Sequence, residues 1–239
     1  MNYVPKTLLS VGADYKTVKG EKLGYLTGIL YMSPNKYICP NATQGCFSAC
    51  LVSAGRGVFS NVKRARQAKT RLFTDNLNMF MNILMKDIER LARKAAKKGL
   101  IPTIRLNGTS DIDYNNVKDS NGKTIFELFP EIQFYDYTPN IKRVLANNST
   151  NYHLTYSVKE DKLSEDNGLT ALFMGYNAAM VFDVLPDSYR GYRVINGDTS
   201  DLRFLDDSGV IVGLTAKGKA KKDTSGFVKR VTNNIKKVG

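Results

Sequence analysis

The sequence has few of the residues on which many enzymes depend. Its 239 residues include three cysteines, one histidine and no tryptophan. A Ser-His-Asp hydrolase would have to use His153, and the Gly-x-Ser-x-Gly pattern that surrounds such a serine is absent. No P-loop pattern occurs either, which argues against an ordinary NTPase. We therefore expect any chemistry to depend on the cysteines and carboxylates.

Long apolar runs are also missing. No segment approaches the roughly 20 apolar residues needed to span a bilayer, so we expect no membrane partner. The first residues lack the apolar core of a secretory signal. An odd number of cysteines cannot all pair as disulfides, and a reducing compartment suits metal-binding thiols better. We expect a globular protein of the cytoplasm.

Acidic residues are in deficit. Asp and Glu total 22 against 35 Lys and Arg, which gives a formal net charge of +13. Such an excess favours a polyanionic partner, above all nucleic acid or a nucleotide substrate. A lysine-rich, solvated surface would give the same excess, and no aromatic RNA-binding signature is present. The charge leaves both interpretations open.

All three cysteines lie in one short segment. Cys39, Cys46 and Cys50 have the spacing C-x6-C-x3-C. They follow an apolar stretch, 23–32, predicted as a buried strand, and precede a stretch, 51–73, predicted as a helix. A loop containing Gly and Pro can wrap around one small object with its thiolates turned inward. Zinc and iron–sulfur clusters are the objects that such thiolates prefer.

Short apolar stretches alternate with helical ones along the rest of the chain. Beyond 23–32, the predicted strands are 103–106, 132–135, 152–157, 178–184, 192–195 and 210–214. The predicted helices are two segments within 61–98, then 125–129, 141–146 and 169–176. This alternation predicts about six βα units and a parallel α/β sheet, either open and doubly wound or curled into a partial (β/α)6 TIM-like barrel. The predicted domains are an N-terminal arm (1–22), a barrel-like catalytic domain (23–215) and a basic C-terminal extension (216–239).

Polar residues follow most predicted strands, which favours the barrel because its strand ends meet at one mouth. They include Asn107, Asp111, Asp136, Ser157, Asn196 and Asp198. Asp111, Asp136 and Asp198 are candidates for orienting a substrate or moving protons. His153, inside a predicted strand, is a further catalytic candidate. The alternative is that these polar residues only cap the helices that follow.

A strand, a three-cysteine loop, a helix and further βα units resemble the layout of the radical S-adenosylmethionine (SAM) superfamily. The resemblance implies that Cys39, Cys46 and Cys50 ligate a [4Fe-4S] cluster whose open iron binds SAM. It also implies SAM contacts from the segment Asn107, Gly108, Thr109 and Ser110, and from Ser157. We add Asn196 as a candidate cofactor contact because it ends a strand at the same edge.

A second resemblance spans most of the chain. One motif, at 39–51, reads Cys-Pro-x-Ala-x-x-Gly-Cys-x-x-x-Cys-Leu and is followed by Ala-Gly-Arg-Gly at 54–57. This combination resembles a protein family common in bacteriophage genomes. The segments 196–204 and 213–226 resemble it as well. This resemblance implies a phage-encoded enzyme, in the host cytoplasm, that modifies nucleic acid or nucleotides.

Two other functions remain open. The three cysteines and His153 could form a Cys3His site for Zn²⁺ in a barrel transglycosylase, with two of the aspartates as nucleophile and general base. Alternatively, the protein is a basic DNA-binding protein with a structural zinc loop, and the lysines of 217–222 contact the polyanion. The second alternative gives the polar strand ends no role.

Overall fold

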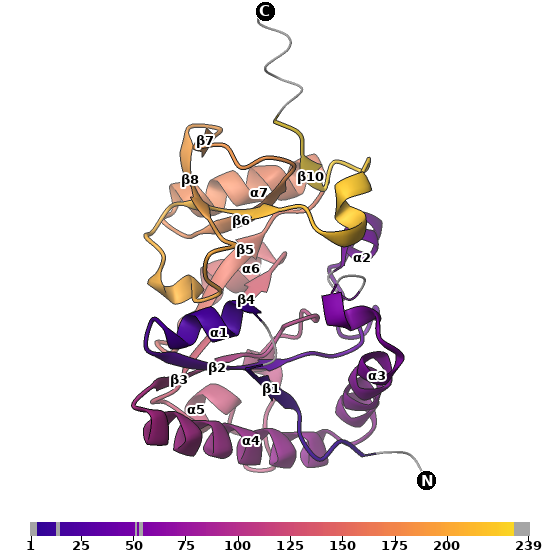
Figure 1. Cartoon of the computed structure of the whole chain (residues 1–239), viewed down its shortest axis with the longest axis vertical. Coiled ribbons are helices and arrows are strands. Elements are labelled where there is room, and N and C mark those ends of the chain that lie inside the picture. The colour runs from indigo at the N-terminus through magenta and orange to yellow at the C-terminus, as the bar shows by residue number, and fades with distance from the viewer. Residues whose placement is uncertain (1–3, 13–14, 51, 53–54, 232–239) are drawn as a thin grey trace, which may run out of the picture.

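A ten-stranded, mostly parallel sheet organises the fold. A computed structural model describes residues 4–12, 15–50, 52 and 55–231 (Figure 1). The strands are β1 (Leu9–Val11), β2 (Tyr25–Leu30), β3 (Ile101–Arg105), β4 (Gln133–Thr138), β5 (Tyr152–Ser157), β6 (Ala178–Phe182), β7 (Ser188–Tyr189), β8 (Tyr192–Asn196), β9 (Ile211–Thr215) and β10 (Val228–Lys229). The α-helices are α1 (Tyr15–Glu21), α2 (Gln44–Ala49), α3 (Ser60–Asp75), α4 (Leu77–Lys98), α5 (Ile125–Leu128), α6 (Ile141–Ala146) and α7 (Lys162–Phe173). Short 3-10 helices are η2 (Gly55–Val58), η3 (Tyr114–Asn116), η4 (Arg203–Leu205) and η5 (Gly218–Lys222).

The strand order is β1-β2-β3-β4-β5-β6-β9-β8-β7, with β10 paired to β6. From β2 to β6, neighbouring strands are parallel and follow the order of the chain. Right-handed crossovers between such strands place their helices on the same face of the sheet. The path has β1 and β7 as its two ends, so the sheet is open. The predicted α/β class with a parallel sheet is confirmed. The described strands do not close into a barrel. From β2 to β6 the strand order does not reverse direction, as it would in a doubly wound sheet.

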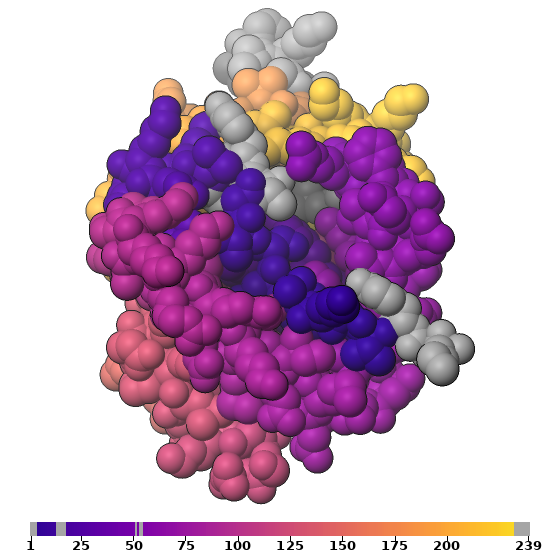
Figure 2. Space-filling model, turned by 60° about the horizontal axis from the view of Figure 1, so that its bottom comes forward, coloured from indigo at the N-terminus to yellow at the C-terminus, as the bar shows by residue number. Residues whose placement is uncertain are grey.

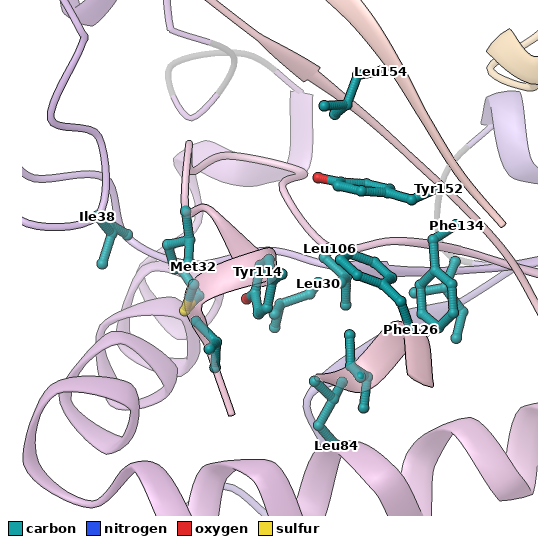
Figure 3. Close-up of a cluster of buried hydrophobic side chains, with 14 of the residues drawn as sticks. Leu30, Met32, Ile38, Leu84, Leu106, Tyr114, Phe126, Phe134, Tyr152 and Leu154 are labelled. Carbon is teal, nitrogen blue, oxygen red and sulfur yellow. The ribbon is translucent and has the colours of Figure 1, made fainter. Parts of the chain in front are cut away.

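The main core lies between the sheet and these helices. The apolar side of α4 includes Phe80, Leu84, Ile88 and Leu91, each three or four residues apart and each almost fully buried. It packs against β2 and β3, where Gly28 allows the close approach of Leu91. Other strand and loop residues complete the cluster shown in Figure 3, among them Leu30, Leu106, Tyr114, Phe126, Phe134, Tyr152 and Leu154.

The other face of the same strands is polar. Because side chains alternate along a strand, Thr27, Thr103, Arg105, Tyr135, His153 and Thr155 point away from the main core. We call this side the polar face. The Thr27 and Thr103 hydroxyls lie 3.0 Å apart. α1 packs on β2 here, on the side opposite α4 (Figure 1), and η4 packs on β4 and β5.

Residues 1–22 were predicted to form an arm or an extra strand. Within their described part, β1 pairs antiparallel with β2, and α1 follows it. The Asp87 carboxylate of α4 accepts a hydrogen bond from the Leu9 amide at 2.9 Å, and the Lys69 ammonium of α3 donates to the Leu8 carbonyl at 2.6 Å. In Figure 2, the indigo N-terminal residues lie between the purple and magenta segments of these helices. Lys69 is buried, so its charge is not presented on the exposed surface of α3.

The C-terminal segment is part of the fold as far as residue 231. Ala216, Ala220 and Val228 form a small buried cluster, against which Ala49 of α2 and Val181 of β6 pack. β10 adds to β6 in parallel, with Val228 opposite Val181. The predicted basic extension is thus not separate between 216 and 231, because its apolar residues cover α2 and β6. Residues 232–239 lie outside the described part of the chain.

Both ends of α4 carry residues that commonly cap helices. Asn76 caps α4: its side chain accepts a hydrogen bond from the Met79 amide at 2.9 Å. Gly99 ends α4 with φ 66°, the left-handed conformation that favours glycine at a helix end. A difference from the prediction is α2, a short helix inside the segment predicted to be a loop. Cys46 therefore lies on a helix.

Candidate functional site

The cysteine segment leaves β2 through local turns. The Asn35 side chain accepts hydrogen bonds from the backbone amides of Tyr37 and Ile38 at 2.9 and 3.0 Å. The Asn35 carbonyl accepts another from the Cys39 amide at 2.9 Å. Thr43 caps α2, accepting a hydrogen bond from the Cys46 amide at 3.3 Å. Asn and Thr favour such turns and caps because their side chains replace missing backbone partners.

The three cysteines come together at this segment and form no disulfide with one another. Cys46 lies on α2 and Cys50 is its C-cap, so the C-x3-C spacing places both on one side of a helical turn. Burial raises the pKa of Cys39 to about 12, and nearby Cys50, Asp111 and Cys46 add to the shift. Burial, followed by Cys50, raises the pKa of Cys46 to about 11. The thiols are thus close enough to influence each other's charge.

Glu160, just beyond β5, anchors the segment from the side. Its carboxylate accepts hydrogen bonds from the Thr43 hydroxyl at 2.7 Å and the Gly45 amide at 3.0 Å. A Cβ at Gly45 would lie 2.6 Å from this carboxylate, so glycine permits the approach. The Lys159 ammonium donates to the Asn41 carbonyl at 3.4 Å. Sequence reasoning missed Glu160, although it noted that a strand ends near this residue.

Asp111 holds the other side of the segment. Its carboxylate accepts hydrogen bonds from Arg143 at 2.6 Å, Thr138 at 2.8 Å and the Asn41 amide group at 3.0 Å. Burial raises the pKa of Asp111, whereas the Arg143 guanidinium opposes that shift. Asp111 lies beside the cysteine segment, because its backbone amide donates to the Ile38 carbonyl at 2.8 Å. Its charge adds to the raised pKa values of Cys39 and Cys46. Arg143 was not predicted.

Asp136 is fully buried beneath Asn107. It accepts hydrogen bonds from the Asn107 amide at 2.7 Å and from the Tyr152 hydroxyl at 3.0 Å. Burial raises the pKa of Asp136 to about 7. Because its acceptors are occupied from within the protein, Asp136 has a structural role here, and its catalytic role stays a prediction.

The segment 107–110 is tied to its surroundings by side chains. The Thr109 hydroxyl accepts a hydrogen bond from the Met32 amide at 3.1 Å, and the Ser110 hydroxyl donates to Asn107 at 2.8 Å. A Cβ at Gly108 would lie 2.8 Å from the Leu30 carbonyl oxygen, so this position needs glycine. These residues fasten the end of β3 to the end of β2.

Asn196 and Asp198 form a separate turn at the end of β8. The Asn196 side chain accepts from the Asp198 amide at 2.9 Å. The Asp198 carboxylate accepts from the Lys217 ammonium at 2.6 Å and the Thr215 amide at 2.9 Å.

His153 and Ser157 lie on the polar face of β5. His153 is next to Arg203, and burial, with a smaller contribution from Arg203, lowers the pKa of His153 to about 4. Ser157, the last residue of β5, is half-buried. Within the described residues, no three His, Cys, Asp or Glu side chains are arranged so that they could hold a metal ion as they stand.

Sequence reasoning also missed the ion pairs of the polar face. Arg105 donates to both carboxylate oxygens of Asp201, at 3.2 and 3.1 Å, and the Tyr135 hydroxyl lies 3.2 Å from the same carboxylate. Arg203 lies 3.3 Å from Asp206. In the sequence, this region was marked only by the resemblance of segment 196–204 to the phage family.

These features define an α/β protein with an open, mostly parallel sheet and a three-cysteine segment at the carboxyl end of β2. A family model described as Gene product 88 (GP88) matches residues 7–231. The chain therefore belongs to the GP88 family, a phage-type family, as the second resemblance predicted. Neither the curated proteins nor the solved structures contain a significant match. Among the described helices, none is both long and apolar enough to cross a membrane.

Proposed function

We propose that this protein is an iron–sulfur enzyme of the radical SAM type that acts on nucleic acid or a nucleotide. One observation supports this most. The only cysteines of the chain gather at the carboxyl end of β2, the first parallel strand of a sheet whose next strands follow in chain order. We propose further that these strands correspond to an opened partial (β/α)6 barrel.

The donor type suits a cluster, and binding one would have to draw the three thiols together from their present arrangement. Three thiols are present, and a [4Fe-4S] cluster held by three thiolates keeps one iron open for another ligand. Cys39, Cys46 and Cys50 would hold it. When bound, a cluster of this kind supplies one electron for the reductive cleavage of SAM. The unusual C-x6-C-x3-C spacing has a local cause, since a turn and an N-cap separate Cys39 from a helix that bears Cys46.

The surrounding residues would keep these thiols in place. Glu160 and Asp111 hold the segment through hydrogen bonds to Thr43, Gly45 and Asn41. The side chains of Asn107 and Thr109 are engaged inside the protein, so we propose that the 107–110 segment meets a cofactor through its backbone and that Ser157 contributes a side chain.

The charge of the chain supports a polyanionic substrate. Arg93, Lys94 and Lys97 are exposed on α4, and the formal net charge is +13. Exposed cations attract phosphates over distances of about a Debye length, roughly 8 Å at physiological salt.

The test is the metal and sulfide content of protein purified without oxygen, with its ultraviolet–visible spectrum. We expect about four iron and four sulfide per chain and thiolate-to-iron absorption near roughly 400 nm. Cys46→Ser should lose most of the iron, whereas Ser48→Ala on the same helix should not. SAM cleavage under a reductant is then measured. A colourless protein with about one zinc per chain would reject the proposal and favour the zinc alternatives.

A further inference from the structure

The polar face contains buried polar atoms without partners. Among the described residues, the atoms without a hydrogen-bond partner include Thr155 Oγ1, His153 Nε2, Arg105 Nε and Arg203 Nε. Thr155 is 0% exposed and Arg203 is 1% exposed. A buried polar group without a partner costs about 1–3 kcal/mol. Several such groups on one face suggest that a ligand supplies the missing partners.

The strand register places these atoms side by side. His153 is opposite Tyr135, and Thr155 is opposite Tyr137. The Arg105 guanidinium lies 4.7 Å from the centre of the Tyr137 ring. Arg203 influences the charge of both Tyr137 and His153, so it lies against the same strands. The polar cluster is therefore compact and comprises Arg105, His153, Thr155 and Arg203.

The missing partner is an acceptor. Arginine nitrogens are donors only, a threonine hydroxyl can donate, and the Nε2 of neutral histidine donates in one of its tautomers. Asp201 contacts Arg105 through its Nη1 atom, and Asp206 lies 3.3 Å from Arg203 Nη1, so the Nε atoms of both arginines still lack an acceptor. Guanidinium groups match the geometry of phosphate oxygens better than other cations do.

We propose that this polar cluster binds the terminal phosphate of the substrate, a phosphomonoester. The inference deepens the proposed function and rests on it for the reaction, although phosphate binding itself needs no cluster. Thr155 is 0% and Arg203 1% exposed, so a ligand reaches them only when this face opens, and a terminal phosphate needs the smallest opening. An internal phosphodiester would need room for chain on both sides. A nucleoside monophosphate and a 5′-phosphorylated oligonucleotide share this chemistry.

The route to the cysteines runs along the same side of the protein. Arg66 of α3 lies 4.9 Å from the centre of the Tyr31 ring, and Tyr31 and Cys50 both influence its charge. Arg105 on β3 pairs with Ile29 on β2, two residues before Tyr31. A molecule whose phosphate is bound at the polar cluster would therefore extend past Tyr31 toward Cys50.

The experiment is a calorimetric titration of the full chain with a deoxynucleoside 5′-monophosphate, the matching nucleoside, and a short oligonucleotide with or without a 5′-phosphate. We expect the phosphorylated form of at least one pair to bind about tenfold or more tightly than its unphosphorylated form, because a hydrogen bond to a charged group contributes that much. The pair that shows the effect identifies the source of the phosphate. Equal binding within both pairs would overturn the proposal.

Thr155→Val provides the sharpest variant because valine has nearly the same shape. We expect its phosphate affinity to fall about tenfold while its melting temperature stays equal or rises, since a buried hydroxyl without a partner is removed. Thr170→Val on the exposed side of α7 is the matched control. Undiminished phosphate binding by Thr155→Val would contradict the assignment.

Iron and sulfide are measured on the same samples. Phosphate binding by protein that takes up no iron would leave the polar cluster as a phosphate site and reject only the radical enzyme. Iron-loaded protein that cleaves SAM without preferring the phosphorylated ligands would reject only the phosphate site.

Discussion

At the scale of single residues, burial changes the chemistry of the ionisable groups. Asp136 and His153 lie on opposite faces of neighbouring strands, and burial favours the neutral form of each. The pKa of Asp136 therefore rises and that of His153 falls. Each shift makes the stability of the fold depend on pH.

For His153 the sign is clear. Its folded-state pKa of about 4 lies below the ordinary 6.5, so the unfolded chain binds the proton more readily. Its stabilising contribution is present above the unfolded pKa and is lost as pH falls toward about 4. Between pH 7 and pH 5, we expect wild type to lose about 1–2 kcal/mol of unfolding free energy relative to His153→Gln.

Urea unfolding of both proteins at several pH values measures this difference. Asp136 changes stability in the opposite direction, but it is common to both proteins and cancels. A constant difference between wild type and variant across this range would contradict the assignment of a buried, neutral His153.

At the scale of elements, the cysteine segment depends on contacts from other strands. Glu160→Ala removes the acceptor for the Thr43 hydroxyl and the Gly45 amide. We expect a loss of about 1–3 kcal/mol in unfolding free energy and lower iron uptake during reconstitution, because the thiols are no longer held in place. Glu131→Ala at an exposed position is the control. Unchanged stability and iron uptake in Glu160→Ala would show that this anchor is dispensable.

The C-terminal strand is a second element whose role is measurable. Val228 is 2% exposed, whereas Val184 is 55% exposed. Val228→Ala should lower the unfolding free energy by about 2 kcal/mol because it deletes two buried methyl groups. Val184→Ala should change it by less than about 0.5 kcal/mol. Equal effects in chemical denaturation would mean that β10 frays from the sheet in solution.

At the scale of the whole molecule, the net charge of +13 governs encounters with polyanions. If nucleic acid is the substrate, its binding constant should fall at least about tenfold between roughly 50 and 200 mM salt, because bound cations displace counterions from the phosphates. Fluorescence anisotropy with a labelled oligonucleotide measures this slope. Binding that is independent of salt would instead indicate that the surface cations take no part.

The sequence by itself determined the order and type of most elements. The stretch 152–157 is both the predicted strand and β5, and 141–146 is both the predicted helix and α6. Such elements depend on local periodicity, on capping residues and on Gly or Pro at their ends, all visible within a few positions. The clustering of the cysteines was visible for the same reason. The family could also be predicted, because the resemblance depended on stretches of sequence along most of the chain.

Only the tertiary structure decided how distant residues meet. Glu160 is 115 residues from Gly45, and Arg105 is 96 residues from Asp201, yet each pair is hydrogen-bonded or ion-paired. In the fold, Asp111 and Asp136 accept hydrogen bonds from groups inside the protein. Apolar residues of 216–231 pack against α2 and β6. No local pattern encodes such contacts. These contacts depend on strand order and register, which are set by the burial of the main core. The same order and register leave donors without partners on the polar face.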